Sequence, residues 1–171
     1  ATPQWAERIF PGKDPVEAER LLWEAIFKIV RVDRDNYLAI WKEHNQALHR
    51  RAKLLSDLKI SELHFKGPGT DFRVGLSHRA IFKGGTDRSP RGVDFEPNIP
   101  TEECFTTPDY HKTEGTVRAM RPFLINGVLI RDLEMTFKSG EIVSFKSSAG
   151  EETFREYIAT DPGAKRLGEV A

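Results

Sequence analysis

The chain has 171 residues, which suggests one domain or slightly more and is long enough to bury a core. Its 26 basic side chains balance 26 acidic ones without a long block of like charge, which argues against nucleic acid and membrane surfaces as main partners. No apolar run approaches the ~20 residues of a membrane span, and no signal-peptide pattern occurs. The single cysteine, Cys104, cannot form an internal disulfide, which favours a reducing compartment.

Both ends of the sequence suggest a piece of a longer chain. The sequence begins at Ala1 instead of a methionine, and large apolar residues occur at once in ATPQWAERIF. The last residues, RLGEVA, follow a helical pattern without a polar tail. The alternative is a whole protein with processed ends.

Two helices are predicted in the first third of the chain. Asp14 can cap the first helix, Pro15 suits its first position, and Glu17 completes a capping box. The second helix is predicted to begin at Asp33 or Asp35. Apolar residues recur three and four positions apart at Leu21, Leu22, Ala25, Ile26, Ile29 and Val30 in the first helix, and at Leu38, Trp41, Leu48, Ala52 and Leu55 in the second. We expect the two helices to contact each other.

From residue 60 onward, apolar and polar residues alternate, which predicts strands joined as hairpins. The turns are predicted at KGPGTD (66–71), at Asn126-Gly127 and at KSGE (138–141). The stretch HRAIFKGG (78–85) predicts a further short strand, followed by a loop over residues 83–101. The side chains expected to share one buried face are Leu63, Phe65, Phe72, Val74, Val117, Met135, Phe137, Val143 and Phe145.

Helices are predicted again at the C-terminus. GEETFREYIATD (150–161) has a helical pattern, and Asp161-Pro162 is expected to begin a last short helix that reaches Leu167. Helices, then strands, then helices indicate an α+β fold with a largely antiparallel sheet. We expect residues 1–171 to form a single α+β segment.

Common catalytic and binding motifs are missing from the sequence. It contains no G-x-G-x-x-G, no P-loop lysine after glycines and no H-E-x-x-H. His44 and His49 are five residues apart, about 140° around a helix, and therefore cannot easily share a metal. Cys104 follows two carboxylates, which do not stabilise a thiolate, so we interpret it as a small buried residue.

The pair Glu102-Glu103 in NIPTEECFTTP is the most informative feature. Carboxylates are hard oxygen ligands for divalent ions, and Pro97, Pro100 and Pro108 stiffen the backbone around this pair. Adjacent residues in extended backbone point to opposite sides, so only one of the two glutamates should face a given site. The residues alone leave two alternatives open, which are a solvated acidic loop and the first turn of a helix that begins at Thr101.

Several motifs together resemble the M29 family of metallo-aminopeptidases. They are LHFKGPGTDFRVGL, RGVDFEPNIPTEECFTTPD, EGTVRA and DPGAKRLGEVA, and they cover nearly the whole chain in order. The resemblance implies a cytoplasmic exopeptidase that acts on peptides with two divalent metal ions, such as zinc or cobalt. It also implies a homodimer and a longer chain, of which this segment is the middle part.

The resemblance implies two metal ligands in this chain. The family motif N-I-P-T-E-E places a metal-binding glutamate at Glu103, and R-L-G-E places a second at Glu169. The remaining family ligands, two histidines, a tyrosine and an aspartate, lie beyond this chain, so we expect no metal to bind it tightly by itself. No residue is assigned as general base. The alternative function is a non-catalytic α+β module for assembly or dimerisation.

Overall fold

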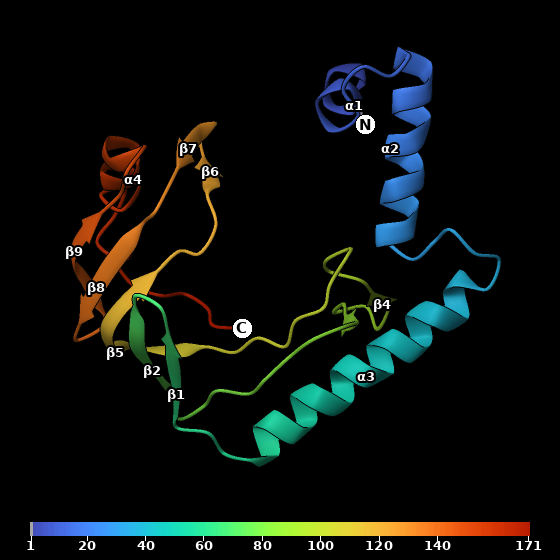
Figure 1. Ribbon diagram of the computed structural model, residues 1–171. Coiled ribbons are helices and arrows are strands. Elements are labelled where there is room, and N and C mark those ends of the chain that lie inside the picture. The colour runs from blue at the N-terminus through green and yellow to red at the C-terminus, as the bar shows by residue number, and fades with distance from the viewer. Residues whose placement is uncertain (1) are drawn as a thin grey trace. The chain divides into compact units, whose positions relative to one another are not determined.

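The structure is a computed structural model that describes residues 2–171 (Figure 1). The chain forms two compact units, which are described separately below. The first comprises Ala1–Arg51 and Gly84–Glu103, and the second comprises Ala52–Lys83 and Cys104–Ala171. None of the described helices is long and apolar enough to cross a membrane.

The first unit is built on helices. It contains α1 (Pro3–Ile9), α2 (Pro15–Ile29), most of α3 (Tyr37–Asp57) and a small hairpin of β3 (Asp87–Arg88) and β4 (Asp94–Phe95). The predicted start of α2 is confirmed, because the Asp14 carboxylate accepts the backbone N–H groups of Val16 at 3.0 Å and Glu17 at 3.3 Å. This cap satisfies two donors that a helix N-terminus otherwise leaves free.

The apolar face of α2 packs on α1, which lies beside it in Figure 1 and which the sequence analysis did not predict. Ala6 of α1 is buried together with Ala18 and Leu22 of α2. The apolar face of α2 that was expected to contact α3 therefore packs on α1. α3 meets the C-terminal end of α2 through Trp41, whose indole N–H donates to the Val30 carbonyl. In α3 the predicted stripe is buried at Trp41, Leu48 and Ala52, whereas Leu38 is exposed because it lies in the first turn of the helix.

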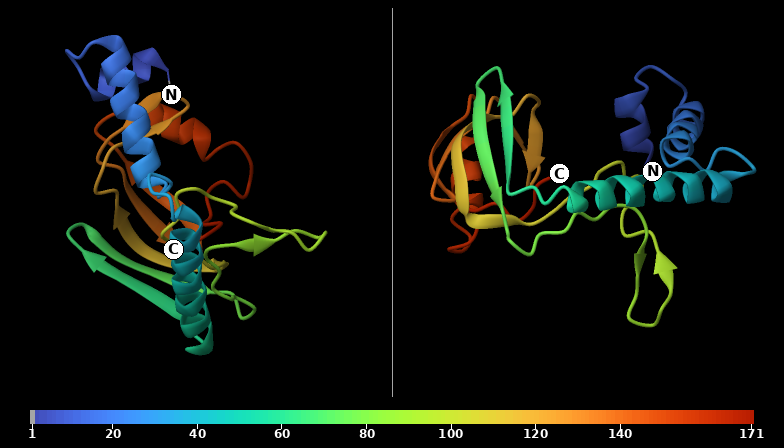
Figure 2. Two further views of the ribbon diagram at one scale, coloured as in Figure 1. Left: turned by 90° about the vertical axis from the view of Figure 1, so that its right-hand side faces the viewer. Right: turned by 90° about the horizontal axis from the view of Figure 1, so that it is seen from below.

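The second unit is built on an antiparallel sheet with the strand order β1-β2-β5-β8-β9. Figure 2 shows the long β1–β2 hairpin beside β5. The strands are β1 (Glu62–Gly67), β2 (Thr70–Leu76), β5 (Pro108–Arg118), β8 (Glu134–Lys138) and β9 (Glu141–Lys146), with a separate hairpin of β6 (Phe123–Ile125) and β7 (Val128–Ile130) near the helix α4 (Glu151–Tyr157). The predicted α+β class is confirmed.

All three predicted hairpin turns are present. Asn126 and Gly127 have φ values of 50° and 82°, and Ser139 and Gly140 have 50° and 84°, as two-residue hairpin turns require. The strand predicted over 78–85 is wrong. Only Lys83 forms an isolated bridge, to Phe105, and the backbone just before it turns as the Ala80 N–H binds the Ser77 carbonyl.

Two apolar cores stabilise the second unit. Phe72, Val74, Leu76 and Phe137 form the first, and Ile130, Leu133, Phe154 and Ile158 form the second. Most members of the predicted buried face are buried or half-buried, but Phe65 is 37% exposed and Val143 is 57% exposed. A β-bulge pairs Phe137 with Ile142, so Ile142 packs on the first core in place of Val143.

The predicted short helix from Asp161 to Leu167 is wrong as well. The segment forms turns, in which the Asp161 carboxylate accepts the Gly163 N–H at 2.6 Å and the Asp161 carbonyl accepts the Ala164 N–H. An aspartate side chain that binds its own backbone two residues on offers an alternative to a helix. The C-terminal helical region is therefore α4 alone.

Candidate metal centre

The two adjacent glutamates have different surroundings. Both side chains are exposed, whereas Thr101 just before them is buried. Glu102 forms an ion pair with Arg31, and its other oxygen lies 3.7 Å from His44 Nε2. The Glu103 carboxylate binds none of the other side chains in residues 2–171. It is therefore Glu103 that is free to take a ligand.

Residues 101–104 belong to neither a helix nor a turn. This rules out the alternative that Thr101 begins a helix with the glutamates in its first turn. The Thr101 carbonyl instead accepts a hydrogen bond from His44 Nε2 at 2.7 Å. Because a carbonyl oxygen only accepts, Nε2 of His44 carries the proton. This hydrogen bond from His44 of α3 thus holds the backbone directly before the two glutamates.

Glu169 lies in a segment that is fixed to the sheet of the second unit. Its neighbour Val170 forms an antiparallel bridge with Thr106, with N–H···O distances of 2.8 and 3.1 Å. Leu167 and Val170 pack against the first core. The Glu169 carboxylate is exposed and binds no other side chain within the described residues. The bridge therefore fixes the backbone next to Glu169 within the second unit.

Arg166 adds a polar anchor to this C-terminal segment. Its guanidinium donates to the backbone carbonyls of Tyr110 at 2.6 Å and Ser139 at 3.2 Å, and to the Glu141 carboxylate. Close contact is possible because Gly140 has no side chain, since a Cβ there would lie 1.8 Å from the Tyr110 carbonyl oxygen. The segment that carries Glu169 is therefore held at two points.

His44, His49 and His64 each bond to an oxygen atom elsewhere in the described chain. His49 Nε2 bonds to the Thr86 carbonyl at 3.0 Å, and His64 Nε2 bonds to the Asp71 carboxylate at 2.7 Å. Within residues 2–171 no group of three or more histidine, cysteine, aspartate and glutamate side chains could hold a metal ion. Cys104 is half-buried, not fully buried as expected.

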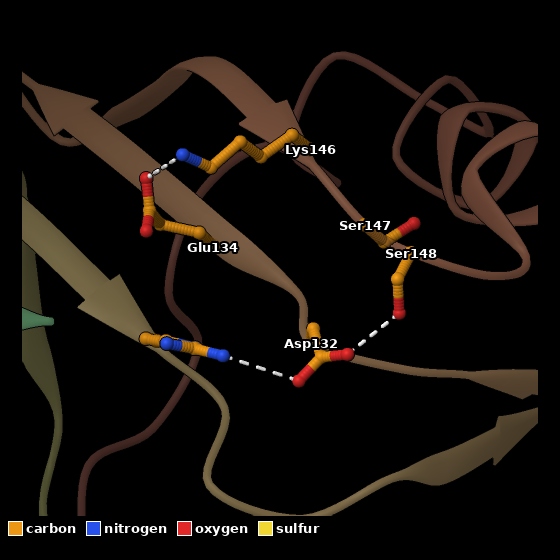
Figure 3. A pocket seen from close by; sticks show the side chains of 6 residues that line it. Asp132, Glu134, Lys146, Ser147 and Ser148 are labelled. Carbon is orange, nitrogen blue, oxygen red and sulfur yellow. Dashed lines mark hydrogen bonds and ion pairs between the residues drawn. The ribbon is translucent and has the colours of Figure 1, made fainter.

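A separate cavity of about 350 Å³ lies where β5 and β9 end and β8 begins (Figure 3). Lys146 pairs with Glu134 at 2.8 Å, and Ser148 donates to Asp132 at 2.6 Å, as the dashed lines in Figure 3 show. Asp132 also pairs with Arg118 at 3.2 Å. The hydrogen bond from Ser148 has the largest effect and that from Arg118 the next, and both lower the pKa of Asp132. Because each carboxylate has a cation beside it, this cavity is a poor site for a metal.

Comparison with known proteins decides the family. The family described as Thermophilic metalloprotease (M29) matches residues 1–171. The chain belongs to the M29 family. This confirms the resemblance inferred from its motifs.

The M29 relatives are aminopeptidases by name. Aminopeptidase T of Thermus thermophilus is 44% identical over 171 residues, which are 100% of this chain and 42% of that protein. Aminopeptidase 2 of Geobacillus stearothermophilus is 44% identical over 170 residues, 99% of this chain and 41% of that protein. The chain thus spans about 42% of the length of its relatives.

Comparison with solved structures also supports membership of the M29 family. Wild-type AmpT from Thermus thermophilus superposes with a TM-score of 0.88 at 43% identity, and covers 99% of this chain and 41% of its own. A 2,5-dihydroxypyridine dioxygenase from Pseudomonas putida has a TM-score of 0.52 at 19% identity over 74% of this chain and 37% of its own, and shares the fold alone.

Arg31 and His44, the partners of Glu102, were not predicted from the sequence. Arg31 is 71 residues away in sequence and His44 precedes Thr101 by 57, so no local pattern links them. From the sequence, His44 was considered only for its five-residue spacing from His49, which does not favour a shared metal. The one available signal was the expectation that two neighbouring glutamates should differ in role.

Proposed function

We propose that this chain is the middle part of a metal-dependent aminopeptidase that removes N-terminal residues from peptides. Membership of the M29 metalloproteases and relatives named as aminopeptidases support this function. One observation links this function to particular residues. The Glu103 carboxylate has no side-chain partner among the described residues, whereas the neighbouring Glu102 carboxylate pairs with Arg31. Because the chain spans about 42% of its relatives, the active enzyme includes further residues.

Glu103 and Glu169 are the proposed metal ligands in this chain. Both are exposed carboxylates without side-chain partners among the described residues, and hard oxygen donors of this kind fit divalent ions. Two divalent ions, zinc or cobalt, would supply Lewis-acid polarisation of a carbonyl and a water of lowered pKa when bound.

The other ligands of this centre are proposed to come from the part of the longer protein that the chain does not span. Two carboxylates leave most positions around a divalent ion open. The role of residues 2–171 is thus to present two carboxylates on fixed backbone. The Thr106–Val170 bridge and Arg166 fix one of them, and the His44–Thr101 hydrogen bond fixes the other.

Aminopeptidase activity of the full-length enzyme tests this function. We expect Glu103→Ala to lower kcat/KM on a leucyl substrate by at least about 100-fold, the upper range for disturbance of a metal shell, without loss of the fold. Glu7→Ala, at another exposed glutamate, is the matched control and should leave activity unchanged. Full activity of Glu103→Ala would refute the assignment.

We further propose a cytoplasmic homodimer. The sequence has a single cysteine, Cys104, and therefore no internal disulfide, which suits a reducing compartment. Exposed apolar residues on the β6–β7 hairpin, such as Leu124 and Val128, favour association with another protein surface. Sedimentation equilibrium tests the dimer. A dimer that lacks both metal and peptidase activity would favour the alternative, a non-catalytic assembly module.

A further inference from the structure

The loop that ends in the glutamate pair is fixed to the α2–α3 region by four polar contacts. Arg31 pairs with Glu102, and three residues of α3 supply the others. His44 bonds to the Thr101 carbonyl at 2.7 Å, Asn45 donates to Glu96, and His49 bonds to the Thr86 carbonyl at 3.0 Å. The two contacts nearest to Glu103 are those of Arg31 and His44.

Arg31 and His44 are themselves held by a buried tryptophan. Trp41 is 8% exposed, and its indole N–H donates to the Val30 carbonyl at 2.9 Å. The Arg31 guanidinium lies 6.0 Å from the centre of the Trp41 ring, and the His44 ring meets Trp41 edge-on at 5.7 Å. The groups that hold Thr101 and Glu102 are therefore preorganised before any ligand binds.

Stability does not account for the Arg31–Glu102 contact. The Glu102 side chain is 62% exposed, and ion pairs of this exposure add little to the stability of a fold. Nη1 of Arg31 is buried without a hydrogen-bond partner, which costs stability. The contact instead decides which of two neighbouring carboxylates remains free.

Fixing one residue restricts its neighbour. The Thr101 carbonyl and the Glu102 carboxylate are both held, so the backbone directly before Glu103 is restricted. Pairing with Arg31 also keeps Glu102 from competing for a cation. Ligands of a metal are oriented by the groups behind them, and such outer groups affect affinity strongly.

We propose that Arg31 and His44 are positioning residues of the metal centre, which hold Glu102 and the Thr101 carbonyl so that Glu103 alone is offered to the metal. This inference rests on the proposed function, in which Glu103 is a metal ligand. Neither residue touches the metal or the substrate in this account.

Zinc affinity of the full-length enzyme, measured by competition with a chelator, tests the inference. Arg31→Ala should raise the zinc dissociation constant by about 10- to 100-fold, as loss of an outer-shell partner does. The matched control is Arg20→Ala, which removes an exposed arginine–glutamate pair with Glu24 from α2. The control should leave zinc affinity unchanged, and neither variant should lower the melting temperature of the metal-free enzyme by more than a few degrees.

His44 provides a second variant with a built-in rescue. His44→Ala should weaken zinc binding, whereas His44→Gln, whose amide can still donate to the Thr101 carbonyl, should restore most of the affinity. A role in folding alone would lower the melting temperature and leave the zinc dissociation constant unchanged, and that result would overturn the inference.

Glu103→Gln separates the two proposals. If Glu103→Gln does not weaken zinc binding, the proposed function fails at this residue. If it weakens binding while Arg31→Ala and His44→Ala do not, only the positioning role is overturned. Loss of zinc affinity in all three, with normal affinity in Arg20→Ala, is the result we expect.

Discussion

At the scale of single residues, charge pairing determines what each carboxylate of this chain can do. Glu102 is engaged by Arg31, and Asp132 is engaged by Ser148 and Arg118, whereas Glu103 and Glu169 have no such partners among the described residues. A carboxylate with a cation beside it gains little from a metal ion. The unpaired ones are therefore the better ligands.

The pKa of Asp132 gives a prediction at this scale. A hydrogen bond from Ser148, followed by one from Arg118, lowers the pKa of Asp132 in the folded protein. A lowered folded pKa means that this contribution to stability is complete above the ordinary aspartate pKa and is lost as pH falls through the folded pKa. Ser148→Ala should therefore raise the pKa of Asp132 and reduce stability above about pH 4, and its difference from the parent should vanish as pH falls through the folded pKa.

An NMR titration of the Asp132 carboxyl carbon checks this expectation. Ser144→Ala is a suitable control, because Ser144 is an exposed serine of the neighbouring strand β9. The same Asp132 pKa in Ser148→Ala and in the control would show that the Ser148 hydrogen bond is not what stabilises the ionised carboxylate.

At the scale of elements, the β8–β9 turn links the sheet to the C-terminal segment. Gly140 lies against the Tyr110 backbone, and Arg166 reaches the Tyr110 and Ser139 carbonyls at the same place. The turn thus serves as an attachment point for the residues that lead to Glu169. This explains why a segment without a helix can still place a side chain reproducibly.

Two glycines with similar backbone conformation test the role of this turn. Gly140→Ala should lower the free energy of unfolding by about 3 kcal/mol, because φ is +84° and the new Cβ would meet the Tyr110 carbonyl. Gly127→Ala, at φ +82° with open space around it, should cost only about 1 kcal/mol. Urea denaturation compares them, and equal losses would contradict the close approach.

Local patterns predicted the elements whose signals lie within a few residues. Asp14, Pro15 and Glu17 located the start of α2, and Asn126-Gly127 located a hairpin turn, because both signals act through adjacent backbone. The extra residue at Val143 was not predictable, since a bulge depends on the partner strand β8. The turn at Asp161 was missed because its side chain competes with the helix.

The candidate site was predictable only in part. The motifs around Glu103 and Glu169 identified the family, which the comparison confirmed. The partners of Glu102 were not predictable, because Arg31 and His44 are brought to the loop by the packing of Trp41 and not by sequence spacing. Contacts between residues 57 and 71 positions apart require a structure.

At the scale of the whole molecule, similarity to the M29 relatives extends over the entire chain but covers about 42% of their length. Within residues 2–171 no cluster of three metal-binding side chains occurs. Divalent ions held by one or two carboxylates keep most of their water and bind loosely. We therefore expect residues 2–171 alone to bind a divalent ion only weakly.

Calorimetric titration of the 171-residue chain with zinc tests this distinction. We expect weak binding, with a dissociation constant on the order of 10⁻⁴ M or higher, as in weak carboxylate sites. A Glu103→Gln and Glu169→Gln double variant serves as the baseline. Tight uptake of two ions, or release of leucine from a leucyl peptide by this chain, would show that it forms a complete site.

The most direct test of the central claim is a crystal structure of the full-length enzyme with zinc located by anomalous scattering. We predict carboxylate oxygens of Glu103 and Glu169 about 2.0–2.2 Å from zinc, with Glu102 still paired with Arg31. Zinc bound by Glu102 in place of Glu103, or a zinc shell without either Glu103 or Glu169, would contradict it.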